Sequence, residues 1–296
     1  MAGELIMLVG IPGSGKTTYA ANLKKENPDY IIHSSDELRK ELYGDIGNQE
    51  HNAELFEELH RRIRKDIKEE KTVVYDATNL VKKRRVSFLS TINCKKKCVL
   101  FLTDYDTCLK NNQEREMVVP DKVIEHMRKI FCPPHWHEGF DEIITVRNEK
   151  KQYAPLIKAT KGFDQENSHH TLTLDVHLMK AAEQFSDEEY CLKTAAYLHD
   201  IGKLFTKTKV NLNGEDDGEA HYYSHHNVSA YEFLCIDENL DDLEASLYIA
   251  NLIYYHMYPY LSWKQSKKSK EKDKRLIGEK MYKDIIRLHE ADKKAR

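Results

Sequence analysis

Several features common in other protein classes are missing from this chain of 296 residues. No stretch approaches the roughly 20 consecutive apolar residues that a bilayer-spanning helix needs, so we expect no membrane partner. The six cysteines are few and irregularly spaced, which excludes a disulfide framework and favours a reducing, cytoplasmic location. The N-terminus has neither a basic segment nor a small-residue cleavage site, so we expect no signal peptide.

Neither sign of charge dominates the sequence. The 46 Lys and Arg residues against 49 Asp and Glu give a net charge of −3, which excludes a globally basic nucleic-acid binder but not a local basic groove. Charged residues make up 32% and hydrophobic residues 40% of the chain, which suits a helix-rich protein with real cores. The length predicts two domains at about 150 residues each.

The hydrophobic pattern divides the chain in two. Residues 1–150 alternate apolar runs with charged helical stretches, and the expected strands are 5–9, 30–32, 72–75, 99–102 and 142–146. This alternation predicts an α/β domain with a parallel sheet flanked by helices. Residues 151–164 are polar and are interpreted as a linker, whereas residues 165–296 show helical periodicity and predict an all-α domain. The lysine-rich stretch 264–275 is typical of a solvated mobile loop.

A phosphate-binding motif follows the first expected strand. Gly10 to Thr17 fits G-x-x-x-x-G-K-[ST] without a mismatch, and a helix-compatible stretch comes next. Backbone N–H groups of such a loop surround phosphate oxygens, while Lys16 reaches the terminal phosphates and Thr17 ligates Mg²⁺. The motif therefore predicts ATP and Mg²⁺ as ligands. The expected nucleotide-binding residues are Gly10, Gly13, Ser14, Gly15, Lys16, Thr17 and Thr18.

Three further positions in this half suggest phosphoryl transfer. Asp36 and Arg39 follow the second strand and share a helix face, so a carboxylate can accept a hydroxyl proton while a guanidinium binds a phosphate. An N-terminal cap with an ordinary salt bridge explains the same pair equally well. Asp76 follows the third strand and either assists Mg²⁺ or caps a helix. Arg115 lies where an arginine can stabilise transferring phosphate, although most surface arginines have no such role.

These residues together resemble the phage-type polynucleotide 5′-kinase family over roughly residues 4–147. The resemblance rests on the phosphate-binding loop, Ser35-Asp36-x-x-Arg39, Asp76-x-Thr78-Asn79 with Arg84-Arg85, and a lid ahead of Val119-Pro120. It implies that Asp36 is the general base for a 5′-hydroxyl, that Arg39 binds a neighbouring phosphate of the acceptor, and that Arg115 contacts the donor phosphates. Asn111 stands where the family often has another lid arginine, which leaves Arg115 alone or assisted by Lys110.

Histidines mark the second half. His177, the pair His199-Asp200, His225 with His226, and His256 recur at expected helix positions, and no cysteine lies at zinc spacing. Imidazole with carboxylate suits Mn²⁺, Fe²⁺, Co²⁺ or Ni²⁺, and such an ion generates a nucleophile for phosphoester hydrolysis. The other interpretation is that these histidines are ordinary core residues, with their hydrogen bonds satisfied and no metal bound.

This half resembles the HD phosphohydrolase superfamily over roughly residues 165–296. The motifs are Thr173 to His177, Tyr197 to Lys203, His221 to His226, and Leu288 to Asp292. The resemblance, closest to HD domains attached to some tRNA nucleotidyltransferases, implies a minimal metal site of His177, His199, Asp200 and Asp292. It also implies that His225 and His256 extend this site toward two metals and that Lys203 contacts the scissile phosphate.

The two halves together favour nucleic-acid end healing. The first would phosphorylate 5′-OH ends of RNA or DNA, and the second would remove a 3′-phosphate or open a 2′,3′-cyclic phosphate, giving ends that a separate ligase joins. This resembles bifunctional kinase–HD end-healing proteins with the domain order reversed. Basic segments at 82–85 and 95–97 either guide a polyanion or are solvated surface. The alternatives are a nucleoside or nucleotide kinase fused to a nucleotidase, and a kinase regulated by a nucleotide-sensing HD domain.

Overall fold

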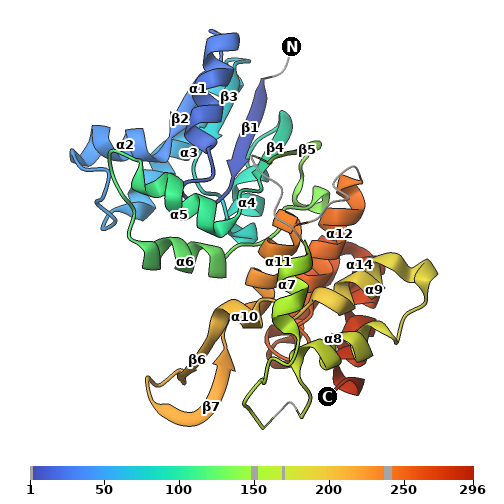
Figure 1. Cartoon of the computed structure of the whole chain (residues 1–296). Helices are drawn as coiled ribbons and strands as arrows, with labels where there is room; N and C mark the ends of the chain where they lie inside the picture. The colour runs from blue at the N-terminus through green and yellow to red at the C-terminus, as the bar shows by residue number, and fades with distance from the viewer. Residues whose placement is uncertain (1–2, 148–152, 169–170, 237–241) are drawn as a thin grey trace. The chain divides into compact units, whose positions relative to one another are not determined.

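The computed structural model describes residues 3–147, 153–168, 171–236 and 242–296. The chain forms two compact units, one of Met1–Met127 with Pro134–Glu149 and the other of Arg128–Pro133 with Lys150–Arg296. In Figure 1 the first unit contains the large sheet, and the second is mostly helical. Among the described residues, no helix is both long and apolar enough to cross a bilayer.

A five-stranded parallel sheet forms the centre of the first unit. Its strands run in the order β2-β3-β1-β4-β5, and the prediction of an α/β domain with a parallel sheet is confirmed. All carboxyl ends of the strands share one edge, so the segments that follow β1, β2 and β3 meet there. The strands are β1 (Glu4–Val9), β2 (Ile31–Ser34), β3 (Thr72–Asp76), β4 (Lys95–Phe101) and β5 (Glu142–Val146).

Helices flank this sheet because their apolar residues recur at helical spacing. The clearest case is α3, which buries Leu55, Leu59, Ile63 and Ile67 and packs against β2 and β3. The helices are α1 (Lys16–Glu26), α2 (Ser35–Tyr43), α3 (Asn52–Lys68), α4 (Lys82–Leu89), α5 (Tyr105–Gln113), α6 (Asp121–Lys129) and the 3₁₀ turn η1 (Trp136–Glu138).

The described residues of the second unit are mostly helical, as the sequence pattern predicts, but they also form an antiparallel hairpin that the prediction of an all-α domain did not include. Helix α11 is its central element, since every one of its residues except His226 is buried. The elements are α7 (Tyr153–Thr160), α8 (Leu174–Ala182), η2 (Asp187–Glu189), α9 (Tyr190–Leu198), α10 (Lys203–Thr206), β6 (Lys207–Val210), β7 (Asp216–Tyr222), α11 (His225–Ile236), α12 (Leu243–Tyr255), α13 (Ser262–Gln265) and α14 (Lys267–Lys294).

Two stretches differ from their sequence-based interpretation. The segment interpreted as a linker contains helix α7, which buries Leu156 and Thr160. The lysine-rich stretch interpreted as a loop is helical, because lysine and glutamate are good helix formers and the Ser266 side chain caps the helix by accepting from the Ser269 N–H at 3.1 Å. Gly278, at φ 83°, introduces a kink within α14.

A short segment of the first 150 residues also belongs to the second unit. Arg128 forms a buried ion pair with Glu232 at 2.6 Å, and the Asn227 side chain donates to the Phe131 carbonyl at 2.8 Å. These contacts explain why Arg128–Pro133 is grouped with the helices rather than with the sheet. No sequence signal marks such an exchange, since both partners are remote in the chain.

Candidate active sites

The phosphate-binding loop connects β1 to α1 and needs glycine at two closely approached positions. A Cβ atom on Gly13 would lie 2.1 Å from the Cys108 carbonyl oxygen, and Gly13 itself has φ 79°. A Cβ atom on Gly10 would lie 2.7 Å from the Ser14 hydroxyl oxygen. The Asn111 side chain donates to the Gly13 carbonyl at 2.9 Å, so a residue of α5 holds the backbone of the phosphate-binding loop. Asn111 thus supports the loop at the position where the resembling family often has an arginine.

Lys16 lies folded onto this loop and Thr17 contacts the end of β3. The Lys16 ammonium donates to the Ile11 carbonyl at 2.8 Å, and burial lowers its pKa to about 8, partly offset by Asp76. The Thr17 hydroxyl donates to an Asp76 carboxylate oxygen at 3.0 Å, and burial raises the pKa of Asp76. A hydroxyl and a carboxylate oxygen are the hard donors that Mg²⁺ prefers, so this pair fits a magnesium ion beside the loop.

The structure brings Asp36, Arg39 and Arg115 together at the same edge of the sheet. Asp36 Oδ1 lies 3.3 Å from an Arg39 nitrogen, and Asp36 Oδ2 lies 3.5 Å from an Arg115 nitrogen. Asp36 is not the cap of α2, because the Ser34 side chain accepts from the Glu37 N–H. Asp36 lies in the first turn of α2, where a negative charge favours the helix dipole, so both this position and the ion pair with Arg39 remain compatible with a structural role.

Arg115 and Arg39 are held in different ways. Arg39 is buried and anchored to the Asn52 side-chain oxygen at 2.8 Å, whereas Arg115 lies in the loop after α5 and is a third exposed. Buried Asn112 closes that loop by exchanging two hydrogen bonds with the Val119 backbone, at 2.8 and 3.0 Å. The loop that carries Arg115 is therefore held at both ends, and the Arg115 side chain has few contacts that would fix it. Asn112 was missed because a polar residue beside a lid arginine gives no sequence signal of its own.

The basic segment 82–85 does not act as a uniform phosphate-binding patch. Arg85 is fully buried in a two-point ion pair with Glu138, at 2.7 and 2.8 Å. Its remaining N–H groups donate to the Asn79 and Leu80 carbonyls, both at 2.9 Å. Arg85 thus supports the loop that follows β3, and the interpretation of this residue as a polyanion guide is wrong.

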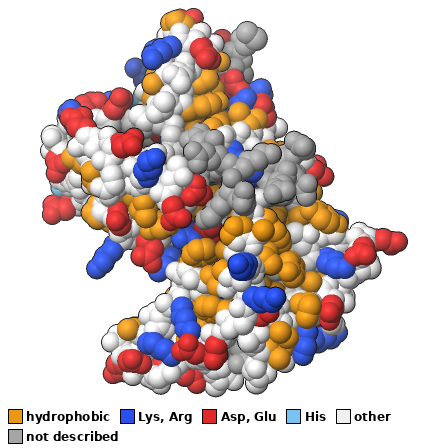
Figure 2. Space-filling model, in the orientation of Figure 1, with side chains coloured by type: hydrophobic (Ala, Val, Ile, Leu, Met, Phe, Trp, Pro, Cys, Tyr) orange, Lys and Arg blue, Asp and Glu red, His pale blue; other side chains and the backbone are white. Residues whose placement is uncertain are grey.

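The basic segment 95–97 lies at the opposite edge of the sheet from the phosphate-binding loop. Lys95 begins β4, and its amino end faces away from the carboxyl edge where Asp36 and Asp76 gather. Lys95 and Lys97 pair with Glu142 at 3.4 and 2.9 Å. The segment is part of a strand rather than of a helix or loop, and its ion pairs with Glu142 partly compensate its charge. The view in Figure 2 likewise shows basic and acidic side chains interspersed rather than gathered by sign.

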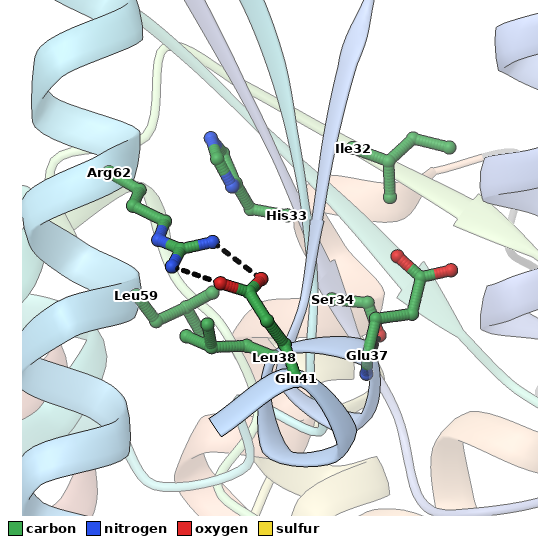
Figure 3. Close-up of a pocket in the computed structure, with 8 residues that line it drawn as sticks. All are labelled: Ile32, His33, Ser34, Glu37, Leu38, Glu41, Leu59 and Arg62. Atoms are coloured by element: carbon green, nitrogen blue, oxygen red, sulfur yellow. Dashed lines mark hydrogen bonds and ion pairs between the residues drawn. The ribbon is translucent and has the colours of Figure 1, made fainter. Parts of the chain in front are cut away.

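A small pocket opens beside α2, between β2 and α3. Figure 3 shows the Arg62 guanidinium meeting the Glu41 carboxylate across it, at 2.6 and 2.8 Å, with Glu37 pointing to the other side of α2. Its volume of about 100 Å³ is below the several hundred Å³ of pockets that enclose small ligands. Asp36, Arg39 and Arg115 do not line this pocket, so it is separate from the grouping of those three side chains.

Six buried side chains converge in the second unit. Between His177 and His199 the Nε2 atoms are 3.2 Å apart, and between His225 and His256 they are 3.3 Å apart. Asp292 Oδ1 lies 3.4 Å from His177 Nε2. The six predicted metal ligands are all brought together, from α8, the end of α9, α11, the end of α12 and α14: His177, His199, Asp200, His225, His256 and Asp292.

All four histidines are oriented by backbone carbonyls. Each Nδ1 atom lies against one carbonyl oxygen, at 3.3 Å for His177, 2.8 Å for His199, 2.7 Å for His225 and 2.7 Å for His256. A carbonyl only accepts, so Nδ1 carries the proton and the Nε2 lone pair points to the centre of the cluster. Neutral imidazoles with inward Nε2 atoms fit a divalent transition ion.

Asp200 joins the two histidine pairs. Its Oδ1 atom faces His225 and His256 at 3.1 and 3.4 Å, and its Oδ2 atom faces His177 and His199 at 3.4 and 3.5 Å. Burial raises the pKa of Asp200, but the Lys203 ammonium and the surrounding imidazoles outweigh it and hold the pKa well below the usual range. Two overlapping donor sets result, His177–His199–Asp292 and His199–Asp200–His256. His199 is common to both sets but offers a single Nε2 lone pair, so it can bind one ion only. Asp200 has one oxygen toward each histidine pair, so it is the residue that fits between two ions.

Neighbouring residues that sequence reasoning missed hold this cluster in place. Gln165 accepts from Lys203 Nζ at 2.6 Å, and Lys203 also contacts Asp200 at 2.7 Å. The Tyr260 hydroxyl donates to Asp292 at 3.0 Å. Gln165 stands beside the polar stretch interpreted as a linker, and Tyr260 lies in a turn after α12, so neither carried a motif signal.

The glycine of the His-Asp-Ile-Gly-Lys motif has a packing reason. A Cβ atom on Gly202 would lie 2.2 Å from the His225 carbonyl oxygen and 2.7 Å from the Ser229 nitrogen. The Gly202 N–H donates to the Ser229 hydroxyl at 2.8 Å. Gly202 therefore lets α11 approach the end of α9 closely enough for His225 to reach Asp200.

Each half of the chain matches a known protein family. Residues 5–134 match the AAA domain family, and residues 167–295 match the HD domain family. The chain joins a P-loop kinase-type domain to an HD domain. This order is the one that the motifs predict, and the histidine–aspartate cluster lies entirely within the HD domain.

A curated protein is similar to part of this chain. The protein kti12 of Schizosaccharomyces pombe is 28% identical over 168 residues, which cover 49% of this chain and 57% of kti12. The chain thus spans little more than half the length of this curated relative.

Solved structures with some likeness cover about half of this chain. They include the Pnkp1/Rnl/Hen1 RNA repair complex (20% identity, 42% of each chain, TM-score 0.38) and a fungal RNA kinase (15%, 52% of this chain and 40% of that one, 0.40). A gluconokinase from Sinorhizobium meliloti 1021 is similar at 14% identity, over 51% and 85% of the two chains, with a TM-score of 0.37. The assignment of the P-loop and HD domains rests on the family matches.

Proposed function

We propose that this protein heals nucleic-acid ends, phosphorylating a 5′-OH with ATP in the P-loop domain and removing a 3′-phosphate or opening a 2′,3′-cyclic phosphate in the HD domain. The observation that carries the proposal is the grouping of Asp36, Arg39 and Arg115 beside the phosphate-binding loop, on a chain that also holds a six-ligand cluster. One site is equipped to add a phosphoryl group and the other to remove one.

In the P-loop domain, Asp36 accepts the proton of the 5′-hydroxyl as its oxygen bonds to the γ-phosphorus of ATP and the bond to ADP breaks. Arg39, anchored by Asn52, binds a phosphate of the acceptor strand. Lys16 and Arg115 hold the negative charge that spreads over the transferring group. Arg115 would leave its weak 3.5 Å contact with Asp36 for the donor phosphates, which frees the carboxylate to act as a base.

In the HD domain, the four histidines with Asp200 and Asp292 would hold one or two divalent ions. A bound ion of this type supplies Lewis acidity and activates water for phosphoester hydrolysis. Lys203, buried at 3% exposure against Asp200, is placed to neutralise a phosphate oxygen of the substrate. The choice among Mn²⁺, Ni²⁺, Co²⁺ and Fe²⁺ follows from ligand type and availability rather than from this geometry.

A polynucleotide end is the proposed acceptor rather than a free nucleoside. The Asp36 side chain is 45% exposed and that of Arg115 is 34% exposed, so the proposed acceptor side of this site is open to solvent. An open edge of this kind admits the end of a long strand. The complete ligand set also favours hydrolysis over nucleotide sensing by the HD domain. The products are ends that a ligase joins, so a separate ligase is the partner that this function implies.

The test is an end-group assay on a short RNA that carries a 5′-OH and a 2′,3′-cyclic phosphate. The protein receives ATP, Mg²⁺ and Mn²⁺, and both ends are scored. We expect a 5′-phosphate and a 3′-end without its cyclic phosphate. Inertness at both ends, with turnover of free nucleosides and nucleotides, would replace the proposal by the small-molecule alternative.

A further inference from the structure

A strongly basic segment covers the end of α13 and the beginning of α14, and the proposed chemistry does not use it. Residues 264–275 contain seven basic and two acidic residues, in a protein whose net charge is −3. Five of the basic side chains are exposed, and within the described parts of the chain they form no ion pair: Lys264, Lys267, Lys268, Lys272 and Arg275. This set is called the α14 basic segment below.

Some other basic residues of the same unit are paired, in contrast to these five. Lys193 pairs with Asp187, Lys207 pairs with Glu166, and Arg287 pairs with Glu189. Within the segment, Asp273 is already bound, since it accepts from the Trp263 indole N–H at 3.0 Å. The spacings of four and three place Lys268, Lys272 and Arg275 on one helix face. That face therefore carries three basic side chains against one acidic residue, Glu271, which forms no ion pair with them in the described part of the chain.

Aromatic contacts connect the segment to the metal-binding cluster. The Trp263 ring centroid lies 5.9 Å from that of Tyr258, and Tyr258 lies 6.4 Å from His226. His226 in turn lies 6.2 Å from His256, one of the six candidate ligands. Only three ring contacts therefore separate the cluster from Trp263, which is hydrogen-bonded to the basic helix. Tyr258 and His226 are partly exposed along this path.

We propose that the α14 basic segment binds the phosphate backbone of a single-stranded polynucleotide whose 3′-end lies in the HD site. The inference rests on the proposed function and sharpens its substrate class. Unpaired lysine and arginine on one helix face match the charge of a phosphate backbone, and partly exposed aromatic rings beside them suit unstacked bases. Glu271 lies in the segment but is outnumbered by the basic residues around it.

The test compares two triple variants of the full-length protein that remove the same charge. One is Lys268→Ala/Lys272→Ala/Arg275→Ala. The control, Lys158→Ala/Lys161→Ala/Lys180→Ala, removes three exposed lysines from the same unit and outside the segment. The first readout is metal-free binding of a fluorescent single-stranded RNA of about 20 nucleotides, by anisotropy across a salt series. Each phosphate contact adds about 0.7 to the slope of log K against log salt for single strands.

We expect the segment variant to weaken binding by about tenfold or more and to lower the salt slope by about 2, with the control near wild type. The second readout is phosphate release with Mn²⁺, where KM should rise for the long 3′-phosphorylated RNA and stay unchanged for a mononucleoside 3′-phosphate. Equal losses in both triple variants, or no loss in the segment variant, would overturn the inference. So would binding of anionic lipid vesicles without binding of RNA.

The same experiment separates this inference from the proposed function. If the wild-type protein releases phosphate from neither substrate, the proposed HD activity fails. If it processes the long RNA and the segment variant does so equally well, the activity stands and only the basic segment is excluded. Circular dichroism of the variants verifies that α14 remains folded, as expected when exposed residues are replaced by alanine.

Discussion

The two candidate sites differ most in how tightly their side chains are fixed before any ligand arrives. In the P-loop domain, Asp36 is 45% exposed and Arg115 is 34% exposed, and their mutual contact is 3.5 Å. In the HD domain, none of the six candidate ligands is more than 8% exposed at its side chain, and every histidine is held by a carbonyl. This difference in exposure and fixation reflects the kind of ligand that each site is expected to bind.

A triphosphate and a strand end bring their own charge and need room to enter, so an adjustable arginine on a pinned loop suits them. A divalent ion is small and spherical and is bound best by donors that are already in position. This contrast predicts that single changes in the P-loop site alter the rate of transfer, whereas changes around the HD cluster alter ion affinity. The following predictions test this division, from the largest expected effect to the smallest.

The largest effect is expected for Arg115→Ala. Removing a guanidinium that stabilises the transferring phosphoryl group should lower kcat for 5′-phosphorylation by about 10³-fold. Phosphate release by the HD domain should be unchanged. The control is Lys110→Ala, which removes an exposed neighbour on α5 and should have little effect. If Lys110→Ala costs as much as Arg115→Ala, the lid depends on both cations and the role given to Arg115 alone is wrong.

A smaller effect is expected for Tyr260→Phe. Loss of the hydroxyl that donates to Asp292 at 3.0 Å should weaken Mn²⁺ binding by about 10- to 100-fold, as is typical when a group that orients a ligand is removed. Isothermal titration with Mn²⁺ measures the change. Tyr248→Phe is the matched control, because its hydroxyl donates to Asp284, which is not one of the ligands. Equal effects of the two variants would contradict an orienting role for Tyr260.

Gly202→Ala should affect both folding and ion affinity. The new methyl group would meet the His225 carbonyl at 2.2 Å, so α11 must shift, and we expect the free energy of unfolding to fall by about 1–3 kcal/mol. Mn²⁺ affinity should fall with it, because His225 moves with α11. Gly47→Ala in an exposed loop is the control. Unchanged stability together with unchanged Mn²⁺ affinity would show that the approach of α11 is not constrained at this glycine.

The smallest effect is a proton taken up when nucleotide binds. Burial holds the pKa of Lys16 at about 8, so about half of these side chains are neutral at pH 8. Triphosphate restores the charge, and binding should take up about half a proton at pH 8 and almost none from Lys16 at pH 6.5. Calorimetry in buffers of different ionisation enthalpy measures this uptake. Proton release at pH 8 would contradict this prediction. The control variant Lys16→Arg stays charged in the free protein, so it should abolish the proton uptake.

The sequence predicts the parts of both sites that depend on local patterns. An apolar strand before a glycine-rich loop specifies the P-loop, and helical periodicity around His177 and His199 specifies which residues face inward. The elements that long-range contacts decide were not predictable. Arg85 looks like a surface residue in a basic run but pairs with Glu138, and Arg128 belongs to the second unit through Glu232. The stretch 264–275 is a different case, because lysine and glutamate favour a helix and Ser266 caps it, so local signals were sufficient to predict this helix.

The most direct test of the account is a cross-comparison of Asp36→Asn and Asp200→Asn in the full-length protein. Both variants receive the same RNA with a 5′-OH and a 2′,3′-cyclic phosphate, and both ends are scored. Two independent sites predict that Asp36→Asn loses 5′-phosphorylation and retains 3′-end processing, and that Asp200→Asn does the reverse. Loss of both activities in either folded variant would contradict two independent sites of opposite phosphate chemistry on one chain.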